Sequence, residues 1–401
     1  MTAADRADRA HGAGASDTTD GEASPPPAGT GGDVIDVSSV IVCCGSGGVG
    51  KTTTAAVLGL EAARRGRRAV VVTIDPARRL ADALGLDGGL ASEPQRIELD
   101  TDAAWEPGGE LWAMMLDTAA TFDALVRRHA DSDEQIQRIL TNSFYRNIAG
   151  ALSGTQEYMA AETLHELHGD DRFDLVIVDT PPSRNALDFL EAPGVLARFL
   201  DHRLFRLLML PTRGGLRVIG TATQPILKAI GKVVGSDVLA DSVAFFQAFA
   251  GMETGFRERA DDVVRLIRAP ETSFVVVAAP RHDTIGEAVW FANQLVEQGV
   301  GVTSVIVNRT HPEFGRGTAA DAVAAAAGAR VAGDGVLGAL WDNVAALRTL
   351  RDLELAVIAP LVEIVGRERL VVLPLLDGDV HDLSGLLVIA GHLFDHPATD
   401  G

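Results

Sequence analysis

The octapeptide GSGGVGKT at residues 45–52 decides the fold. It follows an apolar run, VIVCC at 40–44, and precedes a helical pattern, TTAAVLGLEAARRG at 53–66. The spacing GxxxxGK[ST] between a strand and a helix indicates a phosphate-binding loop. Its glycines let backbone N–H groups approach phosphate oxygens, and the N-terminus of the following helix favours the same anion. The segment therefore predicts a site for a nucleoside triphosphate.

The side chains of this loop have separate expected roles. Lys51 should neutralise the β and γ phosphates, the Thr52 hydroxyl should ligate Mg²⁺, and Thr53 should contact the α phosphate. The residues expected to contact the nucleotide through the loop are Gly47, Gly48, Val49, Gly50, Lys51, Thr52 and Thr53.

Short β-branched runs alternate with helical patterns along the chain. They lie at 38–44, 68–74, 110–116, 173–179, 272–279, 302–308 and 369–376. Near-continuous apolar strands separated by helices indicate a sheet that is mainly parallel and covered on both faces. We therefore expect an α/β fold with a doubly wound, mainly parallel sheet, whose ligands bind beyond the carboxyl ends of the strands.

Two aspartates follow predicted strands at that end of the sheet. Asp75, in TIDPARRLADAL, is placed to orient a water for in-line attack on the γ phosphate, or alternatively to cap the next helix. Asp179, in FDLVIVDTPPSRNALDFL, matches a carboxylate that holds Mg²⁺. Pro181 and Pro182 set a defined loop behind it, and such a loop can change shape when the γ phosphate leaves.

The amino-acid composition limits which partners the protein is expected to bind and the compartment in which it is expected to lie. The 35 basic and 55 acidic residues give a net charge of −20, which repels phosphate backbones and argues against nucleic-acid binding. The two cysteines are adjacent, Cys43 and Cys44, and cannot form a disulfide framework. With no apolar run long enough to cross a bilayer and no signal-peptide core, we expect a cytoplasmic protein, with peripheral contact at the inner face of the membrane as a variant of that expectation.

The chain divides into a tail and one large domain. Residues 1–34 are rich in Ala, Gly, Asp and Pro and are expected to be disordered, and residues 35–396 form the nucleotide-binding domain. A helical insertion at about 187–270 carries amphipathic stripes at 196–208, 226–234 and 245–252. Such stripes usually form core, but three in one insertion also fit a mobile subdomain that binds a partner.

Together these segments resemble the phosphate-loop ATPases of the arsenite-pump and tail-anchored-protein-targeting family, an ArsA-like group of SIMIBI-type nucleotide hydrolases. The family loop GKGGVGKT is matched except at Ser46. The family's first switch resembles DPARRL at 75–80 and its second resembles DTPPSRNAL at 179–187. The resemblance runs from about residue 38 to 396 and is greatest to the anion-transporting ATPases that high-GC bacteria encode as adjacent paralogues.

The resemblance implies a substrate, a metal and further contacts. ATP and Mg²⁺ would bind, with Asp75 and Lys51 as the catalytic residues and Thr52 and Asp179 at the metal. Asn308 in VIVNRT would contact adenine, and the segment LPLLDGDVHDL at 373–383 would line the base. In LSGTQEYMAAE at 152–162, Glu157 matches a family helix start, while Ser153 and Gln156 depart from it.

Ser46 stands where the family carries a lysine that reaches into the neighbouring subunit's site. A serine cannot supply that charge, which leaves three readings: a homodimer that hydrolyses ATP slowly, a heterodimer with a paralogue that retains the lysine, or substitution by Arg78 or Arg79. We prefer the heterodimer, since the resemblance implies a neighbouring paralogue. The cysteines through which the family's arsenite pumps bind metalloid have no counterpart in this chain.

Two functions remain open. The first is an ATPase that couples hydrolysis to anion transport or to the handling of a membrane protein or apolar client through residues 187–270. The second is a weakly hydrolysing, nucleotide-binding regulatory subunit that activates a paralogue. A partition ATPase of the same branch is disfavoured, because it would need basic residues for DNA and the chain is acidic.

Overall fold

The computed structural model describes residues 31–75, 77–99, 105–148, 155–181, 192 and 236–394. Within these residues the strands form one eight-stranded sheet in the order β3-β4-β2-β5-β1-β6-β7-β8. The strands are β1 (Val40–Gly45), β2 (Arg68–Thr73), β3 (Gln95–Ile97), β4 (Glu110–Met115), β5 (Leu175–Asp179), β6 (Thr272–Ala278), β7 (Val302–Thr310) and β8 (Leu370–Pro374). Neighbouring strands are parallel except β3 and β4.

The predicted α/β fold with a mainly parallel, doubly wound sheet is confirmed. Each of the predicted apolar runs forms a strand, from β1 to β8, and β1 lies between β5 and β6 near the middle of the sheet. The antiparallel strand β3 was not predicted. Its sequence, QRI, is too short and too polar for a periodic signal, and it forms by pairing with β4 at the sheet edge.

Helices cover both faces of the sheet. On one face α7 (Thr155–His168), α12 (Glu253–Ile267), α13 (His282–Glu297) and the C-terminal part of α15 (Gly335–Val365) pack on alternate strand residues such as Val42 and Val276. On the other face α1 (Gly31–Val37), α2 (Lys51–Arg64), α3 (Arg79–Ala83) and α16 (Leu383–Leu393) pack on the intervening residues, such as Ile41 and Val277. Cys43 and Cys44 point to opposite faces and are fully buried.

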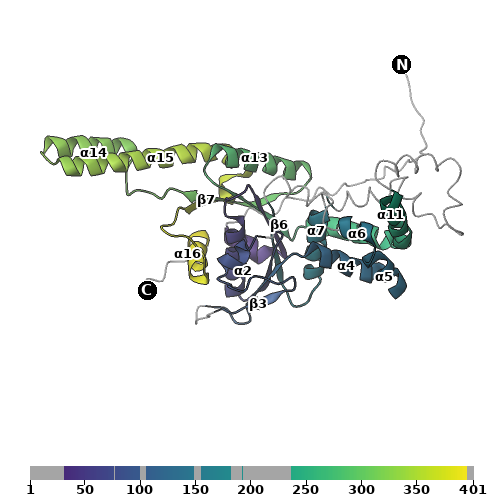
Figure 1. Ribbon diagram of the computed structural model, residues 1–401. Coiled ribbons are helices and arrows are strands. Elements are labelled where there is room, and N and C mark those ends of the chain that lie inside the picture. The colour runs from purple at the N-terminus through teal and green to yellow at the C-terminus, as the bar shows by residue number, and fades with distance from the viewer. Residues whose placement is uncertain are drawn as a thin grey trace, which may run out of the picture.

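A separate helical layer lies beyond α7. It contains α4 (Thr118–His129), α5 (Asp133–Leu140), α6 (Ser143–Ile148) and α11 (Ser236–Phe249) (Figure 1). The stripe Phe245, Phe246, Phe249 and Met252 is buried in its core, so this stripe packs inside the protein. The stripes at 196–208 and 226–234 lie outside the described residues.

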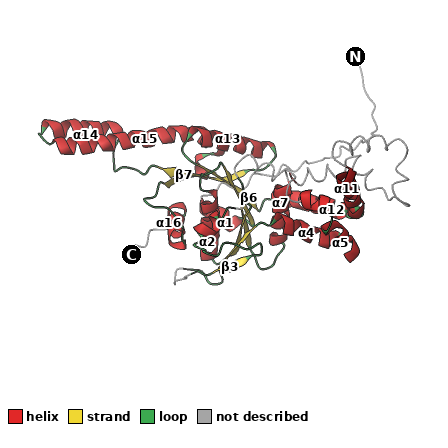
Figure 2. Ribbon diagram, viewed as in Figure 1, coloured by secondary structure: helices red, strands yellow, loops and turns green. Residues whose placement is uncertain are grey.

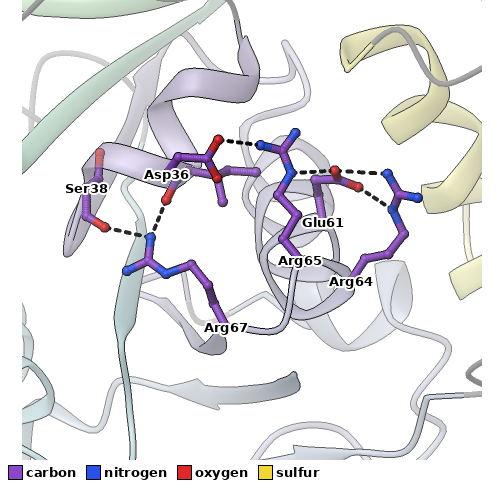
Figure 3. Close-up of polar contacts among 7 residues, drawn as sticks. Asp36, Ser38, Glu61, Arg64, Arg65 and Arg67 are labelled. Carbon is purple, nitrogen blue, oxygen red and sulfur yellow. Dashed lines mark hydrogen bonds and ion pairs between the residues drawn. The ribbon is translucent and has the colours of Figure 1, made fainter. Parts of the chain in front are cut away.

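The folded part of the chain begins earlier than the sequence indicates. Residues 31–34, which we expected in the tail, start α1, and Val34 and Ile35 are buried against α2. Asp36 of α1 pairs with Arg65 at 3.0 Å, and the Arg67 guanidinium donates to the Ser38 carbonyl at 2.8 Å (Figure 3). The fully buried Glu61 accepts hydrogen bonds from both Arg64 and Arg65 (Figure 3). These contacts hold α1 and the residue that follows it against the C-terminal end of α2.

A helical hairpin connects β7 to β8. Helix α14 (Ala319–Val331) runs out from the body of the protein and the long α15 returns, so that the pair extends beyond the remaining described elements (Figure 2). Of the described helices, none is both long and apolar enough to cross a membrane.

Candidate active site

The loop between β1 and α2 lies at the carboxyl end of the central strand. Gly45 has φ 146°, and a Cβ there would lie 2.0 Å from the Val277 carbonyl oxygen of β6, so only glycine fits. Gly50, with φ 99°, precedes α2 as its N-cap. Lys51 is buried at the start of that helix, and its Nζ donates to the Ser46 carbonyl at 2.8 Å. Burial lowers the pKa of Lys51, and the nearby Asp179 carboxylate partly opposes this.

Asp179 ends β5 and faces the first turn of α2. Its Oδ2 accepts hydrogen bonds from Thr52 Oγ1 at 2.8 Å and from Thr73 Oγ1 at 2.9 Å. Its Oδ1 is buried without a hydrogen-bond partner. Burial raises the pKa of this carboxyl, while the hydrogen bonds from the two threonines and the charge of Lys51 act in the opposite direction.

These atoms suit a hard divalent cation. Thr52 uses its hydroxyl hydrogen on Asp179, so its lone pairs remain available, and Oδ1 of Asp179 is an unpaired acceptor in a buried position. Oxygen donors of this kind are those that Mg²⁺ prefers. Among the described residues no three His, Cys, Asp or Glu side chains converge on one point. Mg²⁺ is commonly bound through one or two protein side chains, with phosphates and waters as its other ligands.

Asp75 follows β2 at the same edge of the sheet. Its backbone N–H donates to Thr73 Oγ1 at 3.2 Å, and its Oδ1 accepts from the Ala77 N–H at 3.0 Å. Helix α3 begins at Arg79 with Arg78 as N-cap, so the alternative role of Asp75 as the cap of that helix is wrong. Asp75 instead closes a turn that directs its carboxylate toward the loop, near enough to influence the pKa of both Lys51 and Asp179.

Arg78 and Arg79, which follow Asp75 in the sequence, both contact other groups of this chain. Arg79 Nη1 lies 3.1 Å from Asp75 Oδ2, and Arg78 Nη2 donates to the Asp87 carbonyl at 2.5 Å. Arg79 therefore forms an ion pair with Asp75, the carboxylate that is expected to orient the attacking water. Its side chain is 61% exposed, so the ion pair is open to solvent and can exchange.

A bulge in β7 brings Asn308 and Arg309 over the loop. The β7–β8 register shifts between Val307 and Thr310, and Arg309 has φ 64°. Asn308 Nδ2 donates to the Val49 carbonyl at 2.9 Å, and Arg309 Nη1 donates to the Gly48 carbonyl at 3.2 Å. Beside them lies a cavity of about 500 Å³, whose lining includes Thr53, Asn308, Leu376 and Ile389. Its volume suits a small-molecule ligand, and it adjoins the end of the loop.

A family model described as anion-transporting ATPase matches residues 38–320, a range that includes the loop and both aspartates.

This chain belongs to the anion-transporting ATPase family.

Its relatives carry related names. The chain is 27% identical to ATPase get3 of Schizosaccharomyces japonicus over 268 residues, covering 66% of this chain and 72% of the relative. It is 26% identical to ATPase GET3 of Rhodotorula glutinis, covering 73% and 76%. An uncharacterized protein of Streptomyces coelicolor is 30% identical, covering 68% of this chain and 63% of that protein. Family and relatives together identify the chain as an ATP hydrolase with the ArsA-like α/β fold that the sequence predicts.

One contact sets this chain apart from the loop pattern of its family. Ser46 Oγ donates to Glu287 Oε2 of α13 at 2.6 Å, and Ser46 is buried. The residue at the position of the missing lysine therefore points into its own subunit. Glu287 lies 241 positions away in the sequence and was not predicted as part of the site.

Two further residues near this site, Thr73 and Gln156, were not predicted from the sequence to contact it. Thr73 bonds both Asp179 and the backbone of Asp75, and so joins the two aspartates. A polar residue two positions before Asp75, at the end of an apolar strand, was an available signal for it. Gln156 Nε2 donates to the Ile74 carbonyl at 2.9 Å and ties α7 to the same turn. Glu157 is buried next to it, whereas Ser153, Pro76 and Pro182 lie outside the described residues.

Proposed function

We propose that this ATPase is Mg²⁺-dependent and works as a nucleotide-switched dimer that couples ATP hydrolysis to anion transport or to the handling of a membrane protein or apolar client. The observation that carries the hydrolytic part is Asp179. Two threonine hydroxyls bind one of its carboxylate oxygens, while the other is buried without a partner beside the loop lysine. A buried carboxylate with an open acceptor is costly unless a ligand completes it.

The residues of the loop bind the triphosphate. Backbone N–H groups from Gly47 to Thr53 face the phosphate oxygens, and the N-terminus of α2 adds its positive end. The Lys51 ammonium, bonded to the Ser46 carbonyl in this structure, turns to the β and γ oxygens. Asn308 and the cavity beside it take the adenine ring.

Thr52 and Asp179 would hold Mg²⁺. When bound, the ion would neutralise charge on the β and γ phosphates. Asp75 orients the attacking water, and its turn is held by Thr73, which also bonds Asp179. Catalysis by these residues consists of positioning and charge stabilisation, without a covalent intermediate.

The same contacts support a nucleotide-dependent switch. Thr73 connects the Asp75 turn to Asp179, and Thr180 Oγ1 donates to the Cys43 carbonyl beside the loop. Gln156 joins the Asp75 turn to α7, which packs against α12 and against α4 of the helical layer. Loss of the γ phosphate then changes the position of Asp75 and, through Gln156, of α7.

The Ser46–Glu287 contact favours a heterodimer over a homodimer. With Ser46 turned inward and Arg79 paired with its own Asp75, a paralogue that retains the lysine would complete the site of this chain. The same contact supports the second candidate, a regulatory subunit that binds nucleotide, hydrolyses it slowly and activates the paralogue. Mixing the two proteins should raise the ATPase rate above the sum of the separate rates.

The burial of Cys43 and Cys44 argues against a metalloid as the cargo. Both are fully buried in β1, and burial raises the pKa of Cys44 to about 12, so neither thiol is available as a metalloid ligand. An apolar client would instead use the stripes at 196–208 and 226–234, since the stripe at 245–252 is occupied in the core. We place the protein in the cytoplasm, with peripheral membrane contact through such a client and no nucleic-acid partner.

Single-turnover hydrolysis of ATP by the isolated chain tests the proposal. We expect Mg²⁺-dependent hydrolysis that Asp75→Asn reduces by about 100-fold or more while nucleotide affinity is kept. Binding of ATP with no hydrolysis by the wild-type chain, and rapid hydrolysis by a paralogue only when this chain is added, would support the regulatory subunit. Absence of ATP binding in calorimetry would contradict both candidates.

A further inference from the structure

Arg309 lies at the end of β7, where that strand meets the phosphate loop. A Cβ on Gly50 would lie 2.4 Å from Asn308 Nδ2, so the end of β7 is in direct contact with the loop. The neighbouring Arg309 donates from Nη1 to the Gly48 carbonyl at 3.2 Å. This distance is at the long end of the range for an N–H···O hydrogen bond. The guanidinium is therefore held at the loop by a contact that it can exchange.

The backbone of Arg309 is unusual for an arginine. Among the residues that the structure describes, Arg309 is the one non-glycine residue with a positive φ, 64°. This left-handed region disfavours residues that carry a Cβ, and glycine or asparagine is its usual occupant. The conformation accompanies the register shift between Val307 and Thr310, which directs the side chain of residue 309 to the loop. An arginine at a position that its backbone disfavours points to a role for the side chain.

The charge of Arg309 is not neutralised by a carboxylate. Its side chain is exposed, and within the described part of the chain it forms no ion pair. Arg79, in contrast, pairs with Asp75. In a chain with a net charge of −20, an unpaired cation next to an anion-binding loop favours contact with the bound anion.

The cavity beside the loop indicates which part of the nucleotide Arg309 would reach. Its lining includes Gly50, Thr53, Asn308 and Arg309 itself. Under the proposed function, Asn308 and this cavity take the adenine ring, and Thr53 contacts the α phosphate. A guanidinium that lines the same cavity and contacts the loop at Gly48 lies between the base and the loop, which is the place of the α phosphate.

We propose that Arg309 binds the α phosphate of the nucleotide. The guanidinium exchanges the Gly48 carbonyl, a neutral acceptor, for ionised phosphate oxygens, to which it donates shorter and stronger hydrogen bonds. ATP and ADP share this phosphate, so Arg309 contributes to the affinity for both and holds the nucleotide before and after hydrolysis. The inference rests on the proposed function, because it adds a residue to the same nucleotide site.

Calorimetry with ATP, ADP and tripolyphosphate, each with Mg²⁺, tests the proposal. Arg309→Gln removes the charge and should weaken binding of ATP and ADP by about 10- to 50-fold. Tripolyphosphate binding should weaken by at least about fivefold, because the contact is to phosphate and not to the base. Arg309→Lys keeps the charge and should stay within about fivefold of wild type. The matched control is Arg316→Gln, which removes the charge of an exposed arginine outside this cavity and should change the affinities less than about twofold.

The Tm of the nucleotide-free protein is the second measurement. Asparagine tolerates the left-handed region, so Arg309→Asn should melt no lower than wild type, while its ATP binding should weaken as in Arg309→Gln. A lower Tm would show that Arg309 serves the fold and would overturn the inference.

The binding data separate this inference from the proposed function. A wild-type chain that binds no nucleotide would overturn both. A wild-type chain that binds ATP, with Arg309→Gln binding it equally well, would overturn this inference alone. A loss of ATP binding without a loss of tripolyphosphate binding would also overturn it, since the guanidinium would then contact the base.

Discussion

Ser46 Oγ lies 2.6 Å from Oε2 of Glu287 and donates a hydrogen bond to it. This contact joins the phosphate loop to α13 and places a carboxylate next to the position where the family carries a lysine. A lysine introduced at residue 46 would meet that carboxylate before it could reach a neighbouring subunit. Ser46, which replaces the family's lysine, and Glu287 therefore act together, and a change at one alters the surroundings of the other.

The first prediction concerns this pair. Ser46→Lys alone should leave the ATPase rate of the purified chain within about threefold of wild type, because the ammonium pairs with Glu287. Ser46→Lys combined with Glu287→Gln should raise the rate at least about tenfold, since trans charges contribute strongly to phosphoryl transfer. Steady-state phosphate release measures both, with Glu287→Gln as the control. Full acceleration by Ser46→Lys alone would show that Glu287 does not hold the lysine.

The second prediction concerns Arg79, whose guanidinium lies 3.1 Å from Asp75. The ion pair with Arg79 keeps Asp75 from accepting a hydrogen bond from the attacking water. Arg79→Ala should therefore raise the single-turnover rate about two- to tenfold. Arg78→Ala, which removes only a bond to the Asp87 carbonyl, should leave the rate unchanged. A large fall in rate for Arg79→Ala would instead assign Arg79 as the substitute for the missing lysine.

The third prediction concerns the stability effect of Asp179. Burial raises its pKa in the folded chain, so the folded chain takes up a proton before the unfolded chain as the pH falls. The penalty for the buried charge is therefore present at neutral pH and disappears toward acid pH. We expect nucleotide-free Asp179→Asn to be about 1–3 kcal/mol more stable than wild type at pH 7.

Thermal melts at neutral and acid pH would test this. The advantage of Asp179→Asn should shrink as the pH falls, whereas its Mg²⁺-dependent hydrolysis should be lost at every pH. A variant less stable than wild type at pH 7 would mean that the carboxylate is better compensated than its unpaired Oδ1 suggests.

The fourth prediction separates two roles of Asn308. Its amide supports the Val49 carbonyl of the loop and also lines the cavity that we assign to adenine. Asn308→Ala should weaken ATP binding about tenfold, the equivalent of a lost hydrogen bond, but weaken tripolyphosphate binding less than about threefold. Calorimetry with the two ligands makes the comparison. Equal losses would show that Asn308 acts only through the loop.

The fifth prediction concerns the buried Glu61. Its side chain is fully buried and pairs with Arg64 and Arg65, both at 2.7 Å. Glu61→Gln should lower the free energy of unfolding by about 2–4 kcal/mol, because the amide carries no charge and its NH₂ group would replace one of the two oxygens that accept from the arginines. Asp36→Asn changes a carboxylate that is 58% exposed and pairs with Arg65; it should cost less than about 1 kcal/mol and is the matched control. Denaturant titration measures both.

The sequence was most informative where a signal is local. Runs such as VIVCC and LVIVD are continuous because both sheet faces are covered, and the loop GSGGVGKT needs its residue types at fixed spacing. These features predicted the strands, the sheet and the positions of Lys51, Thr52, Asp75 and Asp179. The partners of those residues come from other strands and helices, so pairs such as Ser46 with Glu287 and Asp75 with Arg79 were not predictable from spacing.

The hairpin of α14 and α15 was not predicted for a different reason. The segment 319–331 is mostly alanine, so its helical propensity is high but its hydrophobic pattern does not distinguish an inner face from an outer one. Only the packing of α14 on α15 shows which alanines are buried. The insertion at 187–270 shows the opposite case. Its stripe at 245–252 has a clear helical period, but the period does not reveal whether the stripe binds a partner or packs in the core, and the structure shows that it packs in the core.

The position of β1 in the sheet has a consequence for biosynthesis. The central strand β1 leaves the ribosome before both of its neighbours, β5 and β6, which start at Leu175 and Thr272. The loop that follows β1 is completed by Asn308 and by residues near Leu376. The apolar strand VIVCC therefore has neither neighbour until Leu175 has been made, and lacks the second one until Thr272, so the nascent chain needs protection during that interval.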